Sequence, residues 1–344
     1  MDLFPLPLLA VILVVGLYDF TNGFHDAADM VATAIASRAM TPEIAIAIVS
    51  VFTFIAPFTV GLAVADTVGT FINIGAASSV AGEAVVIAAL LAAVSYNLGT
   101  WILGYPSSSS NSLAGGLVGA GLYAVGSAHI NWGVAALSHG QLDGVMKVVA
   151  GLLVSPLFGF LFGFLIMKLF FRIFRRFTRA ITPLFVFSQY LSVAWLGFSH
   201  GANDAQKGMA IIGIMLLASG TTDTFTIPDW TIVWCASAIT LGTIFGGWSI
   251  IKTLGFGLYR IRTLHAVANQ LAAALVNTIA TSIGAPTSTT QVVTAALLGN
   301  GAAEKPGHVR WRKAAGIVAG WWLNIPVSLV LGWVYCFIYL LIRS

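Results

Sequence analysis

Charged side chains are scarce in this sequence. Asp, Glu, Lys and Arg make up only 8% of its 344 residues, whereas hydrophobic residues make up 58%. Soluble domains typically carry about 25% charged residues. This composition excludes an ordinary soluble domain and predicts an integral membrane protein.

Cysteine and nucleotide-binding motifs are also lacking. Cys235 and Cys336 are the only cysteines, and they have no metal-ligand spacing, so neither a disulfide framework nor a zinc site is indicated. The phosphate-loop pattern GxxxxGK followed by Ser or Thr does not occur, which argues against a nucleotide-driven pump. Energy for any uphill process would have to come from an ion gradient.

Long apolar runs take the place of charge. A helix needs about 20 apolar residues to cross a hydrocarbon core of about 30 Å. The bilayer leaves no backbone group unbonded, so runs of this length are expected to be helices. The first run lacks the flanks of a removable signal peptide and is expected to be a first span. The runs lie at residues 3–17, 44–64, 84–103, 145–171, 231–251 and 314–342.

The net charge of +4 is confined to a few segments. Residues 39–146 contain no Lys or Arg, whereas basic residues cluster in 168–179, 252–262 and 305–313. Short basic loops stay cytoplasmic, so these segments predict the inner face of a multi-pass protein of the plasma (inner) membrane. This placement of the loops explains the charge, so membrane lipid is an expected partner and nucleic acid is not.

Two parts of the chain match each other in the same order. Residues 20–27, FTNGFHDA, align with residues 198–205, FSHGANDA. Residues 97–110, NLGTWILGYPSSSS, align with residues 277–290, NTIATSIGAPTSTT, at nearly the same offset. Such matches indicate an internal duplication.

The basic segments predict that the duplication is inverted. Placing all of them inside requires three crossings and one hairpin in each half, and an odd number of crossings inverts the second half. We therefore expect a first repeat at 1–171 with its amino terminus outside, a basic cytoplasmic linker at 172–183 and a second repeat at 184–344. The expected fold class is an all-α integral membrane protein with two inverted repeats, broken helices and re-entrant helical hairpins.

The hydroxyl-rich runs each follow Gly-x-Pro and precede an apolar arm too short to cross a membrane. Helix N-termini offer free N–H groups and a partial positive charge, which suit an anion. Two such termini facing each other would surround a tetrahedral oxyanion without an arginine, although hydroxyls at such places can also serve only as helix caps. The candidate anion-binding residues are Ser107, Ser108, Ser109, Ser110, Thr287, Ser288, Thr289 and Thr290.

Carboxylates inside the predicted spans are a second candidate site. An ionisable side chain at that depth is costly unless it is paired or hydrated, so a functional role is the default expectation. Asp26 and Asp204 are repeat equivalents, and their oxygens could bind Na⁺ or take up a proton. The candidate coupling-ion residues are Asn22, Asp26, Asp29, Asn203 and Asp204, with Asp26 and Asp204 as the metal ligands if the ion is Na⁺.

The roles of three further groups stay open at this stage. Asp29 and Lys207 are repeat equivalents that either pair with each other or leave Lys207 free to contact the anion. His25 is either a proton-handling group or a structural hydrogen-bonding residue. The candidate supporting residues of the cavity are Asn97, Asn111, Asn277 and Gln291.

Five segments carry a family resemblance: NGFHDAAD, HGANDAQKGM, GYPSSSSNS, GAPTSTTQ and WWLNIPVS. They resemble the inorganic phosphate transporter (PiT) family over nearly the whole chain. The resemblance implies a secondary phosphate symporter, often homodimeric, with phosphate between the Ser/Thr loops and coupling ions at Asp26 and at Asn203 and Asp204. No cofactor is implied beyond the co-transported Na⁺ or H⁺.

This chain departs from the family in one motif. The fuller family motif, GANDVANA, has a second asparagine where this chain has Asp29 and Lys207. The lysine form is similar to bacterial members associated with protons or metal-phosphate complexes, so the resemblance leaves Na⁺ and H⁺ both open.

Three alternatives compete with a phosphate symporter. One is a permease of the same fold for sulfate or another oxyanion. Another is an intramembrane serine hydrolase, with a nucleophile from residues 107–110 and His25 or His200 as base. A passive anion channel is the third. The duplicated hydroxyl runs and carboxylates favour a transporter, so the chain is not expected to be an enzyme.

Overall fold

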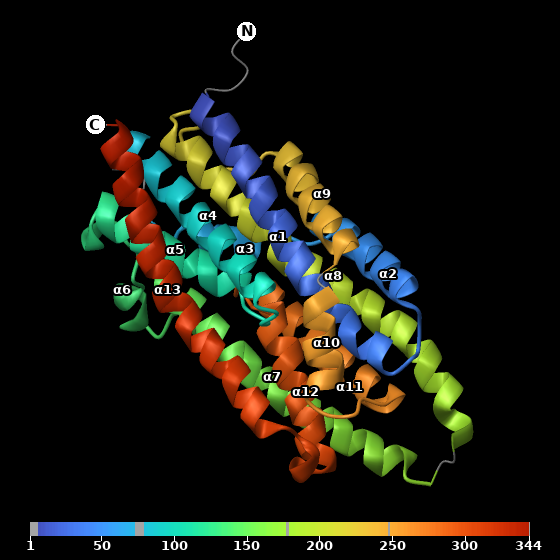
Figure 1. Cartoon of the computed structure of the whole chain (residues 1–344). Coiled ribbons are helices and arrows are strands. Elements are labelled where there is room, and N and C mark those ends of the chain that lie inside the picture. The colour runs from blue at the N-terminus through green and yellow to red at the C-terminus, as the bar shows by residue number, and fades with distance from the viewer. Residues whose placement is uncertain (1–5, 73–78, 177–178, 247, 344) are drawn as a thin grey trace.

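The computed structural model of the protein describes residues 6–72, 79–176, 179–246 and 248–343. These residues form an elongated bundle of helices, with both chain ends at the same end of the bundle (Figure 1). The α-helices are α1 (Leu6–Ala36), α2 (Pro42–Ile55), α3 (Ala63–Gly69), α4 (Ser79–Ile102), α5 (Ser109–Ala124), α6 (Val134–Leu137), α7 (Gly144–Phe174), α8 (Thr182–Ala218), α9 (Asp229–Phe245), α10 (Trp248–Gly257), α11 (Thr263–Ser282), α12 (Thr289–Glu304) and α13 (Trp311–Arg343).

Four of the helices in the described residues are long and apolar enough to cross a membrane. They are α1, α4, α7 and α13. The all-helical membrane fold expected from the apolar runs is therefore confirmed. The longest helix, α8, has 37 residues and carries both Asp204 and Lys207.

Helix breaks occur at places other than the expected ones. The repeat predicts breaks at the two Asp motifs, but α1 and α8 run through these motifs without interruption. The predicted span 44–64 is bent instead, because α2 and its 3₁₀ extension meet α3 at 72°. The predicted span 231–251 is likewise divided, since α9 ends at Phe245 and Gly246 adopts a φ of +51° before α10 begins.

Glycines in the motifs are positions of close packing between helices. A Cβ atom at Gly23 of α1 would overlap with the carbonyl oxygen of Ile239 in α9, and one at Gly201 of α8 would overlap with that of Thr53 in α2. Small residues at such positions let the backbones of two membrane helices approach closely. The motif glycines therefore serve helix packing, and they do not interrupt the helix.

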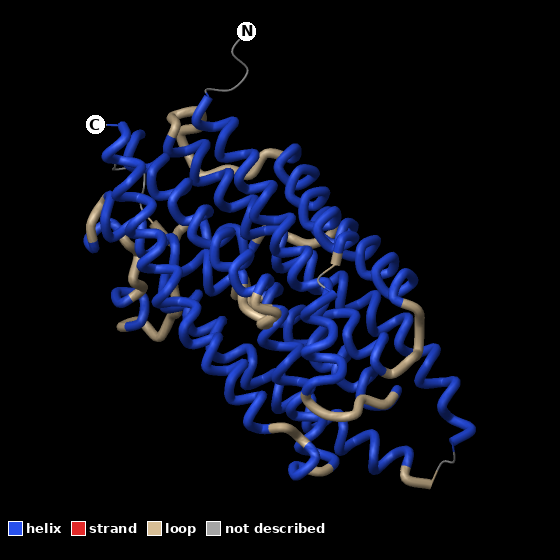
Figure 2. Tube along the Cα trace, in the orientation of Figure 1, coloured by secondary structure: helices blue, strands red, loops and turns tan. Residues whose placement is uncertain are grey.

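Helices α5 and α12 form the inner arms of two hairpins. Each has 16 residues, about 24 Å at 1.5 Å per residue, which is shorter than the hydrocarbon core. Both are buried over most of their length. Figure 2 shows loop segments inside the bundle, about halfway along it, and the loops that begin the two arms meet there, since Ser110 Oγ donates to the Thr287 carbonyl over 2.8 Å.

Helices from the two predicted repeats interleave. The arm α5 packs against α13, and the arm α12 packs against α7. In the same way α1 packs against α9, and α2 packs against α8. Each arm is therefore held by a helix from the other half of the chain. The division at 172–183 and the inverted orientation of the halves stay predictions.

The polar motifs lie between two hydrophobic clusters. Along α1, Leu8 to Tyr18 belong to one cluster and Ala28 to Ala34 to the other. Along α8, Val193 and Leu196 belong to the second cluster, and residues from Ala205 onward belong to the first. The apolar packing therefore surrounds a polar layer in the middle of the bundle.

We predict that Gly201→Ala destabilises the protein, because the added methyl group forces α8 away from α2. Overpacking of this kind costs about 1–3 kcal/mol. Thermal unfolding of the purified chain in detergent measures the effect. Gly316→Ala is the matched control, since Gly316 is an exposed helical glycine of α13 with nothing within 4 Å of its added Cβ. Equal melting temperatures for the two variants would refute the close approach.

Candidate functional site

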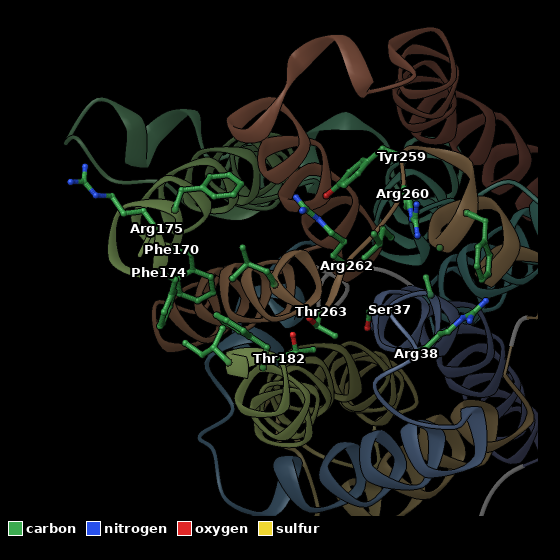
Figure 3. A pocket seen from close by; sticks show the side chains of 18 of the residues that line it. Ser37, Arg38, Phe170, Phe174, Arg175, Thr182, Tyr259, Arg260, Arg262 and Thr263 are labelled. Carbon is green, nitrogen blue, oxygen red and sulfur yellow. The ribbon is translucent and has the colours of Figure 1, made fainter. Parts of the chain in front are cut away.

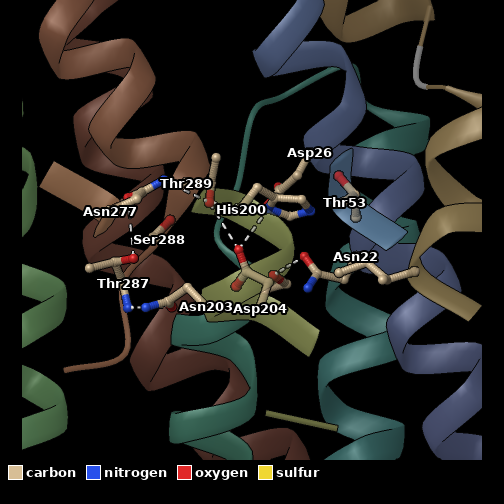
Figure 4. Close-up of polar contacts among 12 residues, drawn as sticks. Asn22, Asp26, Thr53, His200, Asn203, Asp204, Asn277, Thr287, Ser288 and Thr289 are labelled. Atoms are coloured by element: carbon tan, nitrogen blue, oxygen red, sulfur yellow. Dashed lines mark hydrogen bonds and ion pairs between the residues drawn. The ribbon is translucent and has the colours of Figure 1, made fainter. Parts of the chain in front are cut away.

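The polar centre of the bundle combines α1 and α8 with the loops that precede α5 and α12. Figure 4 shows side chains from α1, α8 and the second loop converging there, with Asp26, His200, Asp204 and Thr289 facing one another. The carboxylate and imidazole groups here are at most 2% exposed. A site of this kind lies out of contact with bulk water, so its charges must be balanced by neighbouring groups.

Lys207 and Asp204 form the central ion pair. The Lys207 ammonium donates to the Asp204 carboxylate, to the hydroxyl of Ser110, and to the Thr287 carbonyl over 2.8 Å. A lysine ammonium has three N–H donors, and these contacts use all of them. Because Ser110 lies in the first turn of α5 and Thr287 lies in the loop before α12, Lys207 holds the starts of both arms together.

The second oxygen of Asp204 is also bonded. It accepts from the Thr289 hydroxyl over 2.9 Å and lies 2.8 Å from Nδ1 of His200. Asp204 is therefore bonded through both oxygens, as a buried carboxylate requires.

Asp26 lies near the same ring nitrogen of His200. Its carboxylate is 3.8 Å from His200 Nδ1 and 3.6 Å from His25 Nδ1, and it accepts from the Thr290 hydroxyl over 2.8 Å. The Thr290 hydroxyl also contacts the carboxylate of Asp29. Asp29 therefore lies beside Asp26, and no contact with Lys207 is present among the described residues.

Two asparagines, one in each motif helix, bond to the starts of the hairpin arms. Asn22 of α1 accepts from the Ser109 hydroxyl over 2.6 Å. Asn203 of α8 accepts from the backbone N–H of Thr287 over 3.0 Å and donates to Thr281 over 2.9 Å. Each of the two asparagines therefore bonds to the start of one hairpin arm.

The hydroxyls of the loops divide between two roles. Ser108 and Ser288 are helix N-caps that accept from the backbone N–H groups of Asn111 and Gln291 over 3.1 and 3.3 Å. The side chains of the others bond to groups of α1, α4, α8, α11 or the opposite loop: Ser107, Ser109, Ser110, Thr287, Thr289 and Thr290.

The predicted supporting residues do not all lie at this centre. Asn277 bonds to Thr289 and to Thr287, both over 3.3 Å, and Asn97 accepts from Ser112 over 3.4 Å. Asn111 and Gln291 instead line an apolar cavity of about 250 Å³ between α7, α12 and α13. These two side chains therefore line a cavity formed with α7 and α13.

The structure also brings in residues that the sequence patterns did not single out. Gln206 of α8 accepts from the first backbone N–H groups of α3, at Val64 and Ala65, over 3.0 Å each. Asn324 of α13 donates to the carbonyl of Ser108 over 2.7 Å. An amide inside an otherwise apolar span is the signal that could have identified Asn324.

Asp19 is the most unusual of these additions. It is fully buried in α1 against Gly208 of α8, and among the described residues its carboxylate has only the weak thiol donor of Cys235 as a hydrogen-bond partner. An ionised carboxylate in such surroundings would be very costly. Its position one helix turn before Asn22 makes it a further ionisable group of the same polar layer.

Groups that could bind a cation and groups that could bind an anion lie close together at this centre. One nitrogen or oxygen each from Asp26, His200 and Asp204 lie within 4.8 Å of one another, as do those of His25, Asp26 and Asp29. These groups can hold a proton or a metal cation, while the Lys207 ammonium and the loop hydroxyls can donate to an anion. No arginine takes part among the described residues, so the anion would be bound without a bidentate clamp.

A buried polar layer of this composition, inside a helical bundle that crosses the membrane, defines a membrane transporter rather than an enzyme. The sequence profile described as "Phosphate transporter family" matches residues 22–332. The chain therefore belongs to the phosphate transporter family, and the resemblance drawn from the motifs is confirmed.

Relatives extend over nearly the whole chain. A "Probable low-affinity inorganic phosphate transporter" of Rhizobium meliloti (strain 1021) is 37% identical over 326 residues, 94% of this chain and 93% of its own. A protein of the same description from Bacillus subtilis (strain 168) is 35% identical and covers 98% of each chain. A solved structure described as "The sodium-dependent phosphate transporter" matches the fold with a TM-score of 0.86 at 23% identity, over 98% of this chain and 99% of the other.

We predict that Asp204→Asn strongly destabilises the protein, because it leaves the Lys207 ammonium buried without its carboxylate. Removing one member of a buried pair costs about 3–5 kcal/mol. The double variant Asp204→Asn with Lys207→Gln should recover most of the lost melting temperature. Arg343→Gln is the control, since Arg343 is about half exposed and Glu83 keeps the Tyr339 hydroxyl as a donor, and pairs near solvent contribute about 1 kcal/mol or less. A double variant as unstable as the single one would contradict the proposed balance of charge.

Proposed function

We propose that this chain is a secondary active symporter that moves inorganic phosphate across the plasma membrane, driven by a cation gradient. The observation that carries the proposal is the contact of Lys207 with both hydroxyl loops and with Asp204. It joins an anion-binding surface to a cation-binding group in a single buried cluster. Binding of one ion must then alter the contacts available to the other, as coupled transport requires.

The choice of phosphate rests on the hydroxyl surface and on the relatives. The site offers serine and threonine hydroxyls together with one ammonium, which suit an oxyanion that carries its own O–H donors. The relatives from Rhizobium meliloti and Bacillus subtilis are described as probable transporters of inorganic phosphate. We extend that substrate to this chain, either as the free ion or as a metal-phosphate complex.

For the coupling ion we propose H⁺. The hydroxyl of Thr290 contacts the carboxylates of both Asp26 and Asp29, yet a hydroxyl has a single hydrogen to donate. If it donates to one carboxylate, the other must itself carry a proton in order to bond to it. The pair of carboxylates therefore accommodates a proton, and Asp29 is one of the two residues, with Lys207, at which the chain departs from the family motif.

The histidine supports the same choice. His200 Nδ1 lies between the carboxylates of Asp204 and Asp26, at 2.8 and 3.8 Å. Sodium and other hard cations prefer oxygen ligands, whereas an imidazole between two carboxylates is suited to passing a proton. The remaining features stay proposals as well: a homodimer, an external amino terminus and a cytoplasmic linker at 172–183.

Uptake by proteoliposomes tests the symport. Labelled phosphate should accumulate above its external concentration when an inward proton gradient is imposed, because the gradient supplies the energy. An inward Na⁺ gradient alone should give no accumulation. Uptake that only equilibrates would indicate a channel, and suppression of labelled uptake by excess sulfate would indicate a broader oxyanion permease.

We predict that Asp29→Asn separates coupling from phosphate movement. The amide can donate to Thr290 without carrying a transferable proton, so proton-driven accumulation should fall to the equilibrium level. Exchange of internal for external phosphate, which needs no net proton movement, should continue. Asp223→Asn, at an exposed position in the loop that follows α8, is the control and should behave as the unchanged protein. Normal accumulation by Asp29→Asn would refute the assignment of the proton to this carboxylate pair.

A further inference from the structure

A large basic cavity lies at the end of the bundle that the charge pattern predicts to be cytoplasmic. It measures about 960 Å³ and is bordered by the end of α1, the turn from α7 to α8 and the loop between α10 and α11. None of the described residues that line it is an aspartate or glutamate. Its arginines come from separate segments of the chain and are Arg38, Arg175, Arg260, Arg262 and Arg310.

These arginines are not arranged as balanced ion pairs. Arg262 pairs with Glu304, and Arg310 donates to the Gly257 carbonyl over 3.1 Å. Arg38 and Arg260 have no side-chain acceptor in the part of the chain that the structure describes. Figure 3 shows Arg38, Arg260 and Arg262 grouped on one side of the cavity, with Arg175 at the opposite edge beyond Phe170 and Phe174. The cavity therefore presents a surplus of positive charge.

Arg38 occupies its place at a conformational cost. It has a φ of +59°, the one positive φ among the non-glycine residues that the structure describes. This left-handed conformation follows the end of α1 at Ala36 and is usually adopted by glycine. Arg38 lines the cavity. A glycine would adopt this backbone conformation more easily, but it would bring no charge to the cavity.

Hydrogen-bonded polar side chains lie along α1 and α8 between the cavity and the central site. Ser37, which lines the cavity, donates to Gln189 of α8 over 3.1 Å. Deeper in the bundle, Gln270 of α11 donates to Thr33 over 3.1 Å and accepts from Ser192 over 2.6 Å.

Their spacing on α1 completes the connection. Asp26, Asp29, Thr33 and Ser37 recur at intervals of three and four residues, which places them on one face of the helix. Buried polar groups in an apolar cluster are costly, and the central site does not account for Thr33, Gln189, Ser192 or Gln270. A polar route from the centre to the cavity does account for them.

We propose that this cavity is a second anion site, which binds a phosphate group at the cytoplasmic end, and that the polar side chains on α1, α8 and α11 form the route between the two sites. Guanidinium groups suit phosphate because they donate paired hydrogen bonds to its oxygens. The ligand is either free phosphate or the headgroup of an anionic lipid, since both present the same group. The inference that phosphate moves along this route rests on the proposed transport function.

Equilibrium dialysis of the full-length protein in uncharged detergent, with labelled inorganic phosphate, tests the site. The unchanged protein should bind phosphate at both sites. Arg38→Gln with Arg260→Gln should weaken one of them on the order of tenfold, as expected from the loss of charged hydrogen bonds, and leave the other intact. Raising the salt concentration should weaken the same site, because the arginines are exposed to solvent.

Two variants make the result specific. Arg312→Gln removes an exposed arginine that does not line the cavity, so it should bind phosphate at both sites as the unchanged protein does. Thr290→Val should weaken the central site and leave the arginine site. Unaltered binding by the Arg38 and Arg260 double variant, with both phosphate and lipid, would overturn the proposal.

A second experiment, with lipid, distinguishes a lipid headgroup from free phosphate as the ligand. Native mass spectrometry of the protein with phosphatidylglycerol should show lipid retained by the unchanged chain and lost from the double variant if the headgroup is the ligand. Free phosphate as the ligand predicts equal lipid retention by both. Because neither measurement requires transport, a failure of proton-driven uptake would refute the proposed function while leaving the binding result interpretable.

Discussion

The buried ion pair of Lys207 with Asp204 is the interaction on which the rest of the centre depends. The ammonium uses its three donors on a carboxylate of its own helix, a hydroxyl in the first turn of α5 and a carbonyl of the loop before α12. A charge at this depth is tolerated only when each of its bonds is made. The loops are therefore fixed relative to α8 by electrostatics as well as by packing, and a change at any member reaches the others.

Close helix packing brings these groups within reach of one another. Gly23 and Gly201 allow the backbones of α9 and α2 to touch α1 and α8, and both motif helices are continuous and direct several side chains at the loops. The reciprocal contacts of α5 with α13 and α12 with α7 place the loops against each other. The repeat pattern predicted broken helices with free backbone carbonyls at the centre, but the helices are continuous and the polar groups at the centre are side chains.

Most of the candidate site followed from residue types and their duplication. Ionisable residues in apolar runs identified Asp26, Asp29, Asp204 and Lys207, because burying them without a role would be too costly. Patterns could not distinguish the capping Ser108 from Ser110, which bonds to the opposite loop, since both belong to one serine run. Nor could they exclude Asn111 and Gln291 from the centre, because the direction of a side chain depends on the exact phase of a short helix.

The membrane environment, the helical class and the family all followed from the amino-acid sequence alone, because each depends on composition or on local motifs. The tertiary structure decided which members of those motifs meet. It paired Asp29 with Asp26 through Thr290 rather than with Lys207, and it gathered Arg38, Arg260 and Arg262 around one cavity. These contacts join segments far apart in the chain, so their geometry depends on how whole helices pack, which no local pattern contains.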